Sequence, residues 1–228
     1  MELKQVANFL NGRYLIINKK KDKSTLLNGK LLSSCSVDSL GFSKQVVEYY
    51  DTTDFFFADR GISIYTITTS TTKELIVCYD SGHVKRIDFL KNIPNFFKLT
   101  LNSKKDKVVK YYDQINDAIY QLFPEGLHVD IIEMLQSTSV QLTIMKKCED
   151  YRVVNNNGLK TTMSFTNSTY ISKQKRQKLV HDHLEVQAEA KIDKDLFDKF
   201  LKYIILDCPQ LLRTDTNELE FARKNMGF

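Results

Sequence analysis

The sequence predicts an α+β fold built on antiparallel strands, arranged as a barrel or a sandwich. Apolar and polar residues alternate in many short segments, which is the period of two expected of half-buried strands. Turn-forming residues separate several of these segments, as at Asn28-Gly29, Ser81-Gly82 and Asn156-Asn157-Gly158. Strand segments lie on both sides of a central helical pair, which is not the alternating order of a parallel βαβ sheet.

Each strand is predicted from one such segment. The segments are 13–18, 31–37, 44–50, 62–68, 75–79, 83–89, 99–101, 140–145, 152–154, 160–166 and 181–190. Helical spacing of apolar residues predicts helices at 110–123, 127–135 and 194–206, and a short final helix at 218–225. Asp193 is suited to cap the third of these.

Length and composition favour one elaborated domain. The chain has 228 residues, 42% of them hydrophobic, with 14 Phe and 11 Tyr, which is enough apolar area for a sizeable core. We expect a single domain over 1–228, strand-rich at 1–102, with a helical insert at about 107–137 and with strands and C-terminal helices at 138–228. Neither a membrane-spanning run nor a leader is evident, so we expect a soluble cytoplasmic protein.

Cysteine usage agrees with a reducing compartment. Cys35, Cys78, Cys148 and Cys208 occur singly, without the short spacing of a structural zinc site. Free and mostly buried thiols are therefore expected.

The net charge excludes few classes of function, because 33 basic and 28 acidic residues give a value of only +5. The lysine runs 19–23 and 173–178 do not alternate with aromatic residues as a base-stacking surface would, and solvated loops are the expectation for both. Nucleic-acid binding is thus supported only by modest basicity. Glycine-rich nucleotide loops, nucleophile elbows and helical zinc motifs are absent from the sequence.

Three blocks of sequence, the first of them in two parts, carry a resemblance to a known family. Residues 47–54 read VEYYDTTD and residues 57–64 read FADRGISI; downstream, 183–189 read HLEVQAE and 221–228 read FARKNMGF. In this order they resemble the triphosphate tunnel metalloenzymes, or CYTH domains. The resemblance implies an eight-stranded antiparallel tunnel with helices outside, in which basic residues hold a triphosphate and glutamates bind Mg²⁺ or Mn²⁺.

The chain departs from the family pattern at several positions. The N-terminal Glu-x-Glu-x-Lys is reduced to Glu2-x-Lys4, and Tyr65 and Ile67 stand where the family has arginines. Gln187 separates Glu185 from Glu189. Lost guanidinium groups remove the strongest phosphate contacts, so the resemblance implies weakened or altered chemistry.

Site residues follow from the remaining matches. The resemblance places a phosphate-binding set at Lys4, Lys85, Lys147, Arg152 and Lys160 and a metal set at Glu2, Glu185 and Glu189. Catalytic residues are not assigned. Solvent-facing charge on a sheet, or a polar barrel rim for the glutamate strand with His181 and His183, remains the alternative. Asp51 and Asp54 are expected to form a turn, and the phenylalanines at 55–57 to anchor the core.

The predicted function is binding of a triphosphate-containing or nucleotide-like polyanion in a β tunnel, with weak or altered metal-dependent hydrolysis. The alternative is a CYTH-type binding or protein-interaction module without catalysis. The sequence does not indicate an oligomeric state or a membrane partner.

Overall fold

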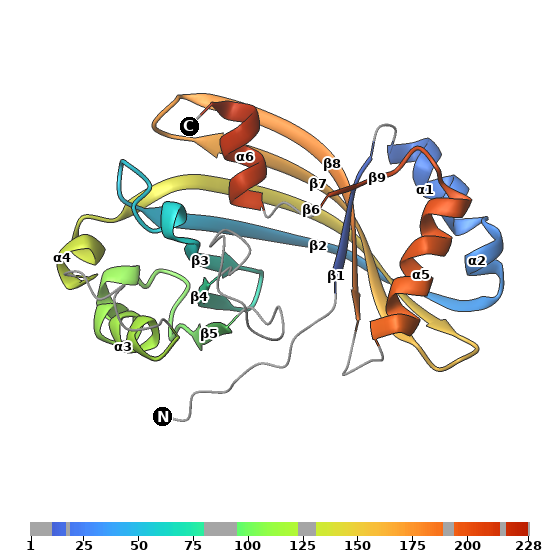
Figure 1. Ribbon diagram of the computed structural model, residues 1–228, viewed down its shortest axis with the longest axis horizontal. Helices are drawn as coiled ribbons and strands as arrows, with labels where there is room; N and C mark the ends of the chain where they lie inside the picture. The colour runs from blue at the N-terminus through green and yellow to red at the C-terminus, as the bar shows by residue number, and fades with distance from the viewer. Residues whose placement is uncertain are drawn as a thin grey trace. The chain divides into compact units, whose positions relative to one another are not determined.

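One sheet of nine strands organises the protein (Figure 1). The computed structural model describes residues 11–16, 19–79, 95–122, 131–188, 194–214 and 218–227. The strand order is β5-β4-β3-β2-β6-β7-β8-β1-β9. The strands are β1 (Asn11–Leu15), β2 (Cys35–Asp51), β3 (Ile62–Thr68), β4 (Lys73–Tyr79), β5 (Asn95–Thr100), β6 (Ser139–Asn155), β7 (Lys160–Ser172), β8 (Gln177–Ala188) and β9 (Leu212–Thr214).

Helices lie in connections between strands, except α6, which follows the last strand β9. They are α1 (Lys19–Leu27), α2 (Lys30–Ser33), α3 (Tyr112–Leu122), α4 (Ile131–Gln136), α5 (Lys194–Asp207) and α6 (Glu218–Met226), with 3-10 turns η1 (Ala58–Arg60) and η3 (Val108–Tyr111). None of the helices in the described ranges combines the length and the apolar character needed to cross a lipid bilayer.

The predicted α+β antiparallel class is confirmed. The pairs β1–β8, β1–β9, β2–β3, β3–β4 and β4–β5 are all antiparallel. The sheet has nine strands where the resemblance implied eight, and the sequence patterns did not include the three-residue β9. Segments 140–145 and 152–154, predicted as two strands, belong to the single strand β6.

Two element predictions are wrong, and one lies outside the described residues. Segment 31–37 is not one strand, because α2 ends at Ser33 before β2 begins at Cys35. The lysine run 19–23, predicted as a loop, lies in α1. The predicted strand 83–89 falls in a range that the structure does not describe.

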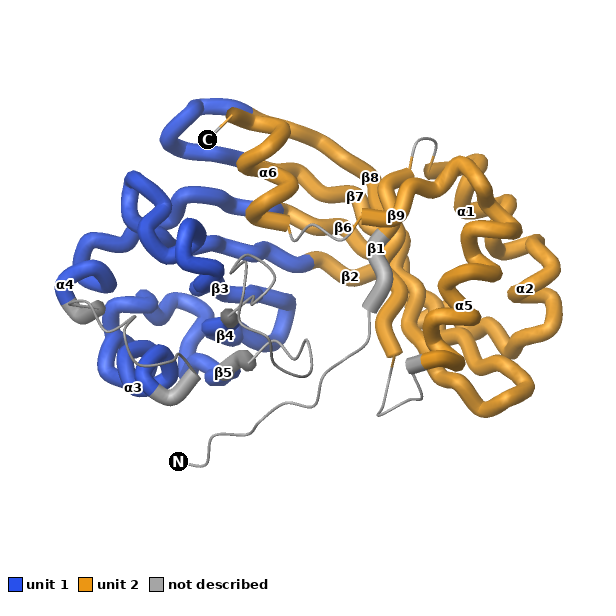
Figure 2. Tube along the Cα trace, viewed as in Figure 1, with its two compact units in different colours: residues 1–6, 45–144, 171–177 blue, residues 7–44, 145–170, 178–228 orange. Residues whose placement is uncertain are grey.

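The chain clusters into two compact units (Figure 2). The described residues of unit 1 lie within 45–144 and 171–177, and those of unit 2 within 7–44, 145–170 and 178–228. Strands β2, β6, β7 and β8 each contribute residues to both units.

The core of unit 1 joins the sheet to α3 and α4. Ile62 and Ile64 on β3 and Leu75 on β4 are at most 3% exposed, and they share a cluster with Ile115 and Ile119 of α3. Alternate strand residues supply this face because a strand has a side-chain period of two. Burying each such side chain contributes about 1.5–3 kcal/mol.

The core of unit 2 joins another part of the sheet to α1, α2 and α5. Leu184, Val186 and Ala188 of β8 are fully buried, and they share a cluster with Phe197 and Ile204 of α5. The alternating neighbours on β8, His183 and Glu185 among them, therefore point to the opposite face of the sheet.

Helix α6 covers that opposite face within unit 2. The ring of Phe221 lies 5.5 Å from Tyr170 and 5.1 Å from His181, measured between ring centroids. Leu219, Ala222 and Met226 are buried on the same helix. The predicted final helix is confirmed, and its packing brings its first turn to the polar residues of β8.

Candidate functional site

Four ionisable side chains of unit 2 meet beneath the first turn of α6. Lys146 comes from β6, His183 and Glu185 from β8, and Glu218 from α6. Lys146 Nζ lies 2.9 Å from Glu218 Oε1 and 3.6 Å from Glu185 Oε1. His183 Nε2 lies 2.9 Å from Glu185 Oε1. We call these four residues the α6 cluster.

Burial makes the α6 cluster more than a surface ion pair. The His183 side chain is fully buried, and those of Lys146 and Glu218 are 10% and 12% exposed, whereas Glu185 is 38% exposed. Charges removed from water interact more strongly, and each needs a partner. The more open Glu185 is the member through which solvent or a ligand can reach the others.

The donor set of the α6 cluster fits a divalent cation. One ligand atom each from His183, Glu185 and Glu218 can be chosen so that all three lie within 4.8 Å of one another. Two carboxylates and an imidazole suit Mn²⁺ or a softer ion better than Mg²⁺, which prefers oxygen ligands throughout. Lys146 already neutralises part of this charge, so a cation and the lysine ammonium compete for the same carboxylates.

The structure brings one of the predicted site residues into the α6 cluster. Glu185 is that residue; Glu2, Lys4, Lys85 and Glu189 lie outside the described residues. The roles of these four residues stay predictions.

The three predicted phosphate contacts that the structure describes are all exposed. By strand alternation, Arg152 lies on the same face of β6 as Lys146, whereas Lys147 lies on the opposite face. Lys160 opens β7, where alternation places it on the face of Thr166, which contacts Cys148 of β6 at 3.4 Å. The phosphate role of all three stays a prediction.

Sequence reasoning did not single out Glu218 or Lys146. A glutamate opening a helix is common, because negative charge is favourable at the helix N-terminus, and so Glu218 carried no functional signal. Lys146 and Lys147 are adjacent, and only the face of the strand separates them.

The first matched segment of the sequence builds a turn. The buried Asp51 carboxylate accepts hydrogen bonds from the backbone N–H groups of Thr52, Phe57 and Ala58 at 2.8, 3.0 and 2.9 Å. Thr52 Oγ1 donates to Asp54. The prediction that Asp51 and Asp54 form a turn is confirmed.

The same segment uses its arginine and phenylalanines for structure. Arg60 donates to the Phe56 carbonyl at 3.0 Å and lies over the Phe56 ring at 3.7 Å. Gly61 then ends η1 with φ 72°, a conformation that favours glycine. Phe55 and Phe57 are 6% and 1% exposed, which confirms the predicted core anchorage.

In unit 1, side chains on the strand face that carries Tyr65 contact one another. Tyr65 packs against Tyr49, with ring centroids 5.0 Å apart. Lys98 on β5 pairs with Glu74 on β4 at 2.8 Å. These contacts occupy the part of the sheet where the family resemblance would have placed arginines.

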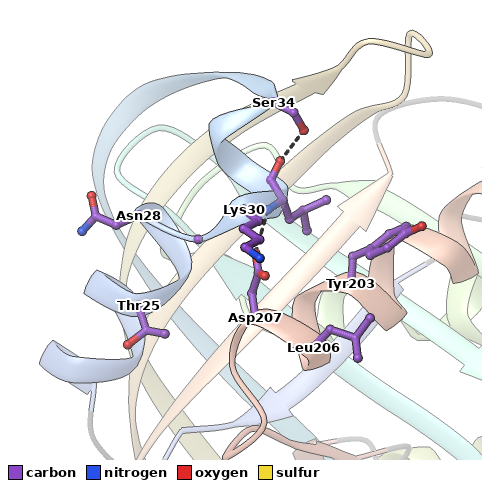
Figure 3. A pocket seen from close by; sticks show the side chains of 9 residues that line it. Thr25, Asn28, Lys30, Ser34, Tyr203, Leu206 and Asp207 are labelled. Atoms are coloured by element: carbon purple, nitrogen blue, oxygen red, sulfur yellow. Dashed lines mark hydrogen bonds between the residues drawn. The ribbon is translucent and has the colours of Figure 1, made fainter.

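A hollow of about 890 Å³ in unit 2 has none of the predicted site residues in its lining (Figure 3). Tyr203, Leu206 and Asp207 of α5 border it, together with Thr25 of α1 and Lys30 of α2. The Asp207 carboxylate accepts a hydrogen bond from the backbone N–H of Leu31 at 2.7 Å. This contact serves to hold α2 against α5.

Comparison with known proteins gives a fold. No protein-family model matches the chain, and no curated protein sequence matches it significantly. Among solved structures, HpAC1 from Hippeastrum, a proposed adenylyl cyclase with a dominant triphosphatase activity, is 11% identical with a TM-score of 0.54, covering 96% of this chain and 95% of that one. The chain has the CYTH, or triphosphate tunnel, fold.

Two further structures share this fold. A proposed adenylate cyclase from Bacillus halodurans is 12% identical, with a TM-score of 0.53 over 92% of this chain and 95% of that one. The PH1819 protein from Pyrococcus horikoshii is 10% identical, with a TM-score of 0.50 over 96% and 99%. In this CYTH fold, the segment that resembles the family's glutamate strand is β8, which supplies two members of the α6 cluster.

Cysteines in the CYTH fold of this chain are all free. Cys148 and Cys208 are buried, and Cys35 and Cys78 are half-buried. Burial raises the pKa of the Cys148 thiol, which keeps it protonated and unreactive. The expectation of free thiols is confirmed.

Proposed function

We propose that this protein binds a triphosphate-bearing ligand together with a divalent cation at the α6 cluster, and that it hydrolyses the ligand slowly. The observation that carries this proposal is the convergence of His183, Glu185 and Glu218 ligand atoms within 4.8 Å. The fold shared with HpAC1, described as having a dominant triphosphatase activity, supports triphosphate as the ligand class.

His183, Glu185 and Glu218 would hold the cation, with Glu2 and Glu189 as further candidate ligands. A bound divalent ion supplies charge neutralisation for the phosphates and polarises a phosphoryl oxygen. Mn²⁺ fits the imidazole-containing set better than Mg²⁺ does.

Lys146 has a second role in this proposal. Once a cation neutralises the two glutamates, the Lys146 ammonium is released to contact phosphate as a point charge. Arg152 and Lys160, which alternation places on the same face of the sheet, are the proposed phosphate contacts beside Lys146. Lys4 and Lys85 are further candidates from the family resemblance, whereas Lys147 faces the other side of β6. Lysines bind phosphate less specifically than the bidentate guanidinium of arginine.

We expect slow turnover because the chain lacks two arginines that the family resemblance implies. Phosphoryl transfer is accelerated mainly by positioning and by positive charge around the transferring group. Tyr65 and Ile67 supply no such charge where the family resemblance has arginines, and Tyr65 packs against Tyr49. We therefore expect binding to be better retained than hydrolysis.

A second candidate is a binding module without metal or catalysis. The ion pairs of Lys146 with Glu218 and Glu185 favour it, because they neutralise the carboxylates without any metal. In this case the α6 cluster would serve only to fix α6 to the sheet.

Titration calorimetry with tripolyphosphate, with and without Mn²⁺, separates the two candidates. We expect Mn²⁺ to be required for tight binding and Glu218→Gln to weaken it about tenfold or more. Asp38→Asn, an exposed acid of the same unit, is the matched control. Binding that ignores Mn²⁺ and Glu218→Gln would contradict the proposal.

Phosphate release from tripolyphosphate and ATP with Mg²⁺ or Mn²⁺ tests the catalytic part. We expect weak phosphate release from the wild type and none from Glu185→Ala. If Glu189 is also a metal ligand, Glu189→Ala should abolish the release as well. Tight Mn²⁺-dependent binding without any release would leave the binding proposal standing and remove hydrolysis. Release unaffected by Glu185→Ala would remove the metal assignment.

A further inference from the structure

A cavity in unit 1 is lined by three lysines that the proposed function does not use. It measures about 390 Å³, and its lining includes Lys73, Lys105 and Lys107 together with Glu48 and Ser139. Unit 1 holds none of the members of the α6 cluster. The cavity volume lies at the lower end of small-molecule pockets, roughly 300–1,000 Å³.

Lys73 is the central observation. It is only 8% exposed, and its Nζ donates a hydrogen bond to the Asp106 carbonyl at 3.2 Å. Among the described residues, no carboxylate lies within ion-pair distance of this ammonium. An ammonium has three donors, and buried charges are normally paired, so Lys73 has unused capacity for an anion.

The acidic residues of the lining are engaged elsewhere. The Asp106 carboxylate accepts from Lys110 at 3.2 Å and from the Tyr111 hydroxyl at 2.8 Å. Glu48 accepts from the Tyr50 hydroxyl at 3.2 Å. Burial, together with this glutamate, raises the pKa of Tyr50 to about 12, so its hydroxyl stays protonated as the donor.

Neutral groups of the lining are suited to an anion with an organic part. The Ser139 hydroxyl accepts from Gln141 at 2.8 Å and keeps its own proton to donate. Val108, Val140 and Tyr112 form apolar wall. We propose that this cavity is a second anion site, which binds a small phosphate monoester with its phosphate on Lys73 and its organic group against these apolar residues.

The test is titration with inorganic phosphate and with adenosine monophosphate, in EDTA so that no divalent cation is available to the α6 cluster. Binding is followed through backbone amide shifts in NMR spectra. We expect shifts at Lys73, Val108 and Ser139, with adenosine monophosphate binding more tightly than phosphate alone. An absence of shifts at these residues with both probes would overturn the proposal.

Variants separate this site from the α6 cluster. Lys73→Met keeps the length of the side chain and is expected to weaken monophosphate binding about tenfold, since it removes the buried charge. Lys104→Met, an exposed lysine outside the lining, is the matched control. Should Lys73→Met fail to fold, Lys107→Met is expected to weaken binding by a smaller factor.

The outcomes are independent of the proposed function. Glu218→Gln is expected to leave monophosphate binding in EDTA unchanged, and Lys73→Met to leave Mn²⁺-dependent tripolyphosphate binding at the α6 cluster unchanged. Monophosphate binding that is equal in wild type, Lys73→Met and Lys107→Met would contradict a site in this cavity.

Discussion

Lys146 neutralises part of the negative charge of the α6 cluster. Its ammonium contacts both glutamates, and its side chain is 10% exposed, against 12% for Glu218. A cation can therefore bind only by displacing it, and the net affinity is the difference between the two interactions.

Replacing Lys146 by methionine should separate these effects. We expect Lys146→Met to bind Mn²⁺ more tightly, by about tenfold, because the competing ammonium is gone and the carboxylates of Glu185 and Glu218 are left without it. Tripolyphosphate binding should weaken at the same time. Calorimetry measures both, with the exposed Lys178→Met as the control. Unchanged Mn²⁺ affinity would show that Lys146 does not compete with the ion.

Asp51 is a residue whose role is structural. It is 2% exposed and accepts three backbone N–H groups of the turn that precedes β3. Removing the carboxylate leaves these buried donors unsatisfied.

Asp51→Ala should therefore lower the free energy of unfolding by about 3 kcal/mol. Urea denaturation measures the change, and Thr53→Ala at an exposed position of the same turn should stay within about 0.5 kcal/mol of wild type. Equal stability of the two variants would mean that the Asp51 contacts contribute nothing net.

At the scale of elements, the ion pair of Lys23 with Glu149 joins α1 to β6. Burial acts to raise the pKa of Glu149, but hydrogen bonds from Lys23 and Tyr151 outweigh it and place the pKa below its ordinary value of 4.5. A carboxylate with a depressed pKa stabilises the fold fully above its unfolded pKa. That contribution is lost as pH falls through the folded pKa.

Glu149→Gln should consequently cost about 1 kcal/mol at pH 7. The difference from wild type should shrink as the pH falls below 4.5 and should vanish as it passes through the lower pKa of the folded state, where the wild-type carboxylate becomes protonated. Urea denaturation at pH 7, 4 and 3 measures it. A difference that stays constant over this range would contradict the assigned ion pair.

Phe221 of helix α6 packs its ring against Tyr170 and His181 of the sheet. Phe221→Ala should loosen α6, raising hydrogen exchange of its amides while that of α5 stays unchanged, because the α5 core lies on the other face. Lys224→Ala, exposed on the same helix, is the control. Equal exchange of α6 in both variants would show that Phe221 does not anchor it.

The sequence patterns predicted elements well where local spacing decides them. Alternation located β3 and β4, and the apolar stripe of α5 located that helix, because both faces of these elements differ in polarity. The sequence patterns failed at α2, where the backbone N–H of Leu31 donates a hydrogen bond to the Asp207 carboxylate, 176 positions later in the chain. A contact so distant in the chain leaves no local signal.

The candidate site was predictable in part. Glu185 was identified from the family resemblance, whereas His183 was noted on the same strand face only as part of a polar rim. Glu218 becomes a neighbour of Glu185 only when α6 packs on β7 and β8. Lys146 and Lys147 point to opposite faces of β6, and a shift of one residue in strand register would exchange the two faces.

At the scale of the whole molecule, the CYTH fold persists at 10–12% identity to the matched structures. Alternation and core volume specify such a fold, and many sequences meet these requirements. Function depends on far fewer residues, and here the α6 cluster is the group whose geometry fits a cation.

Electron paramagnetic resonance of Mn²⁺ tests the central claim most directly, because it reports the ion rather than a product. We predict one tightly bound Mn²⁺ per chain, a spectrum that changes when tripolyphosphate is added, and loss of both in Glu218→Gln. Free Mn²⁺ spectra at equimolar protein and ion, or bound Mn²⁺ that Glu218→Gln leaves unaltered, would contradict the account.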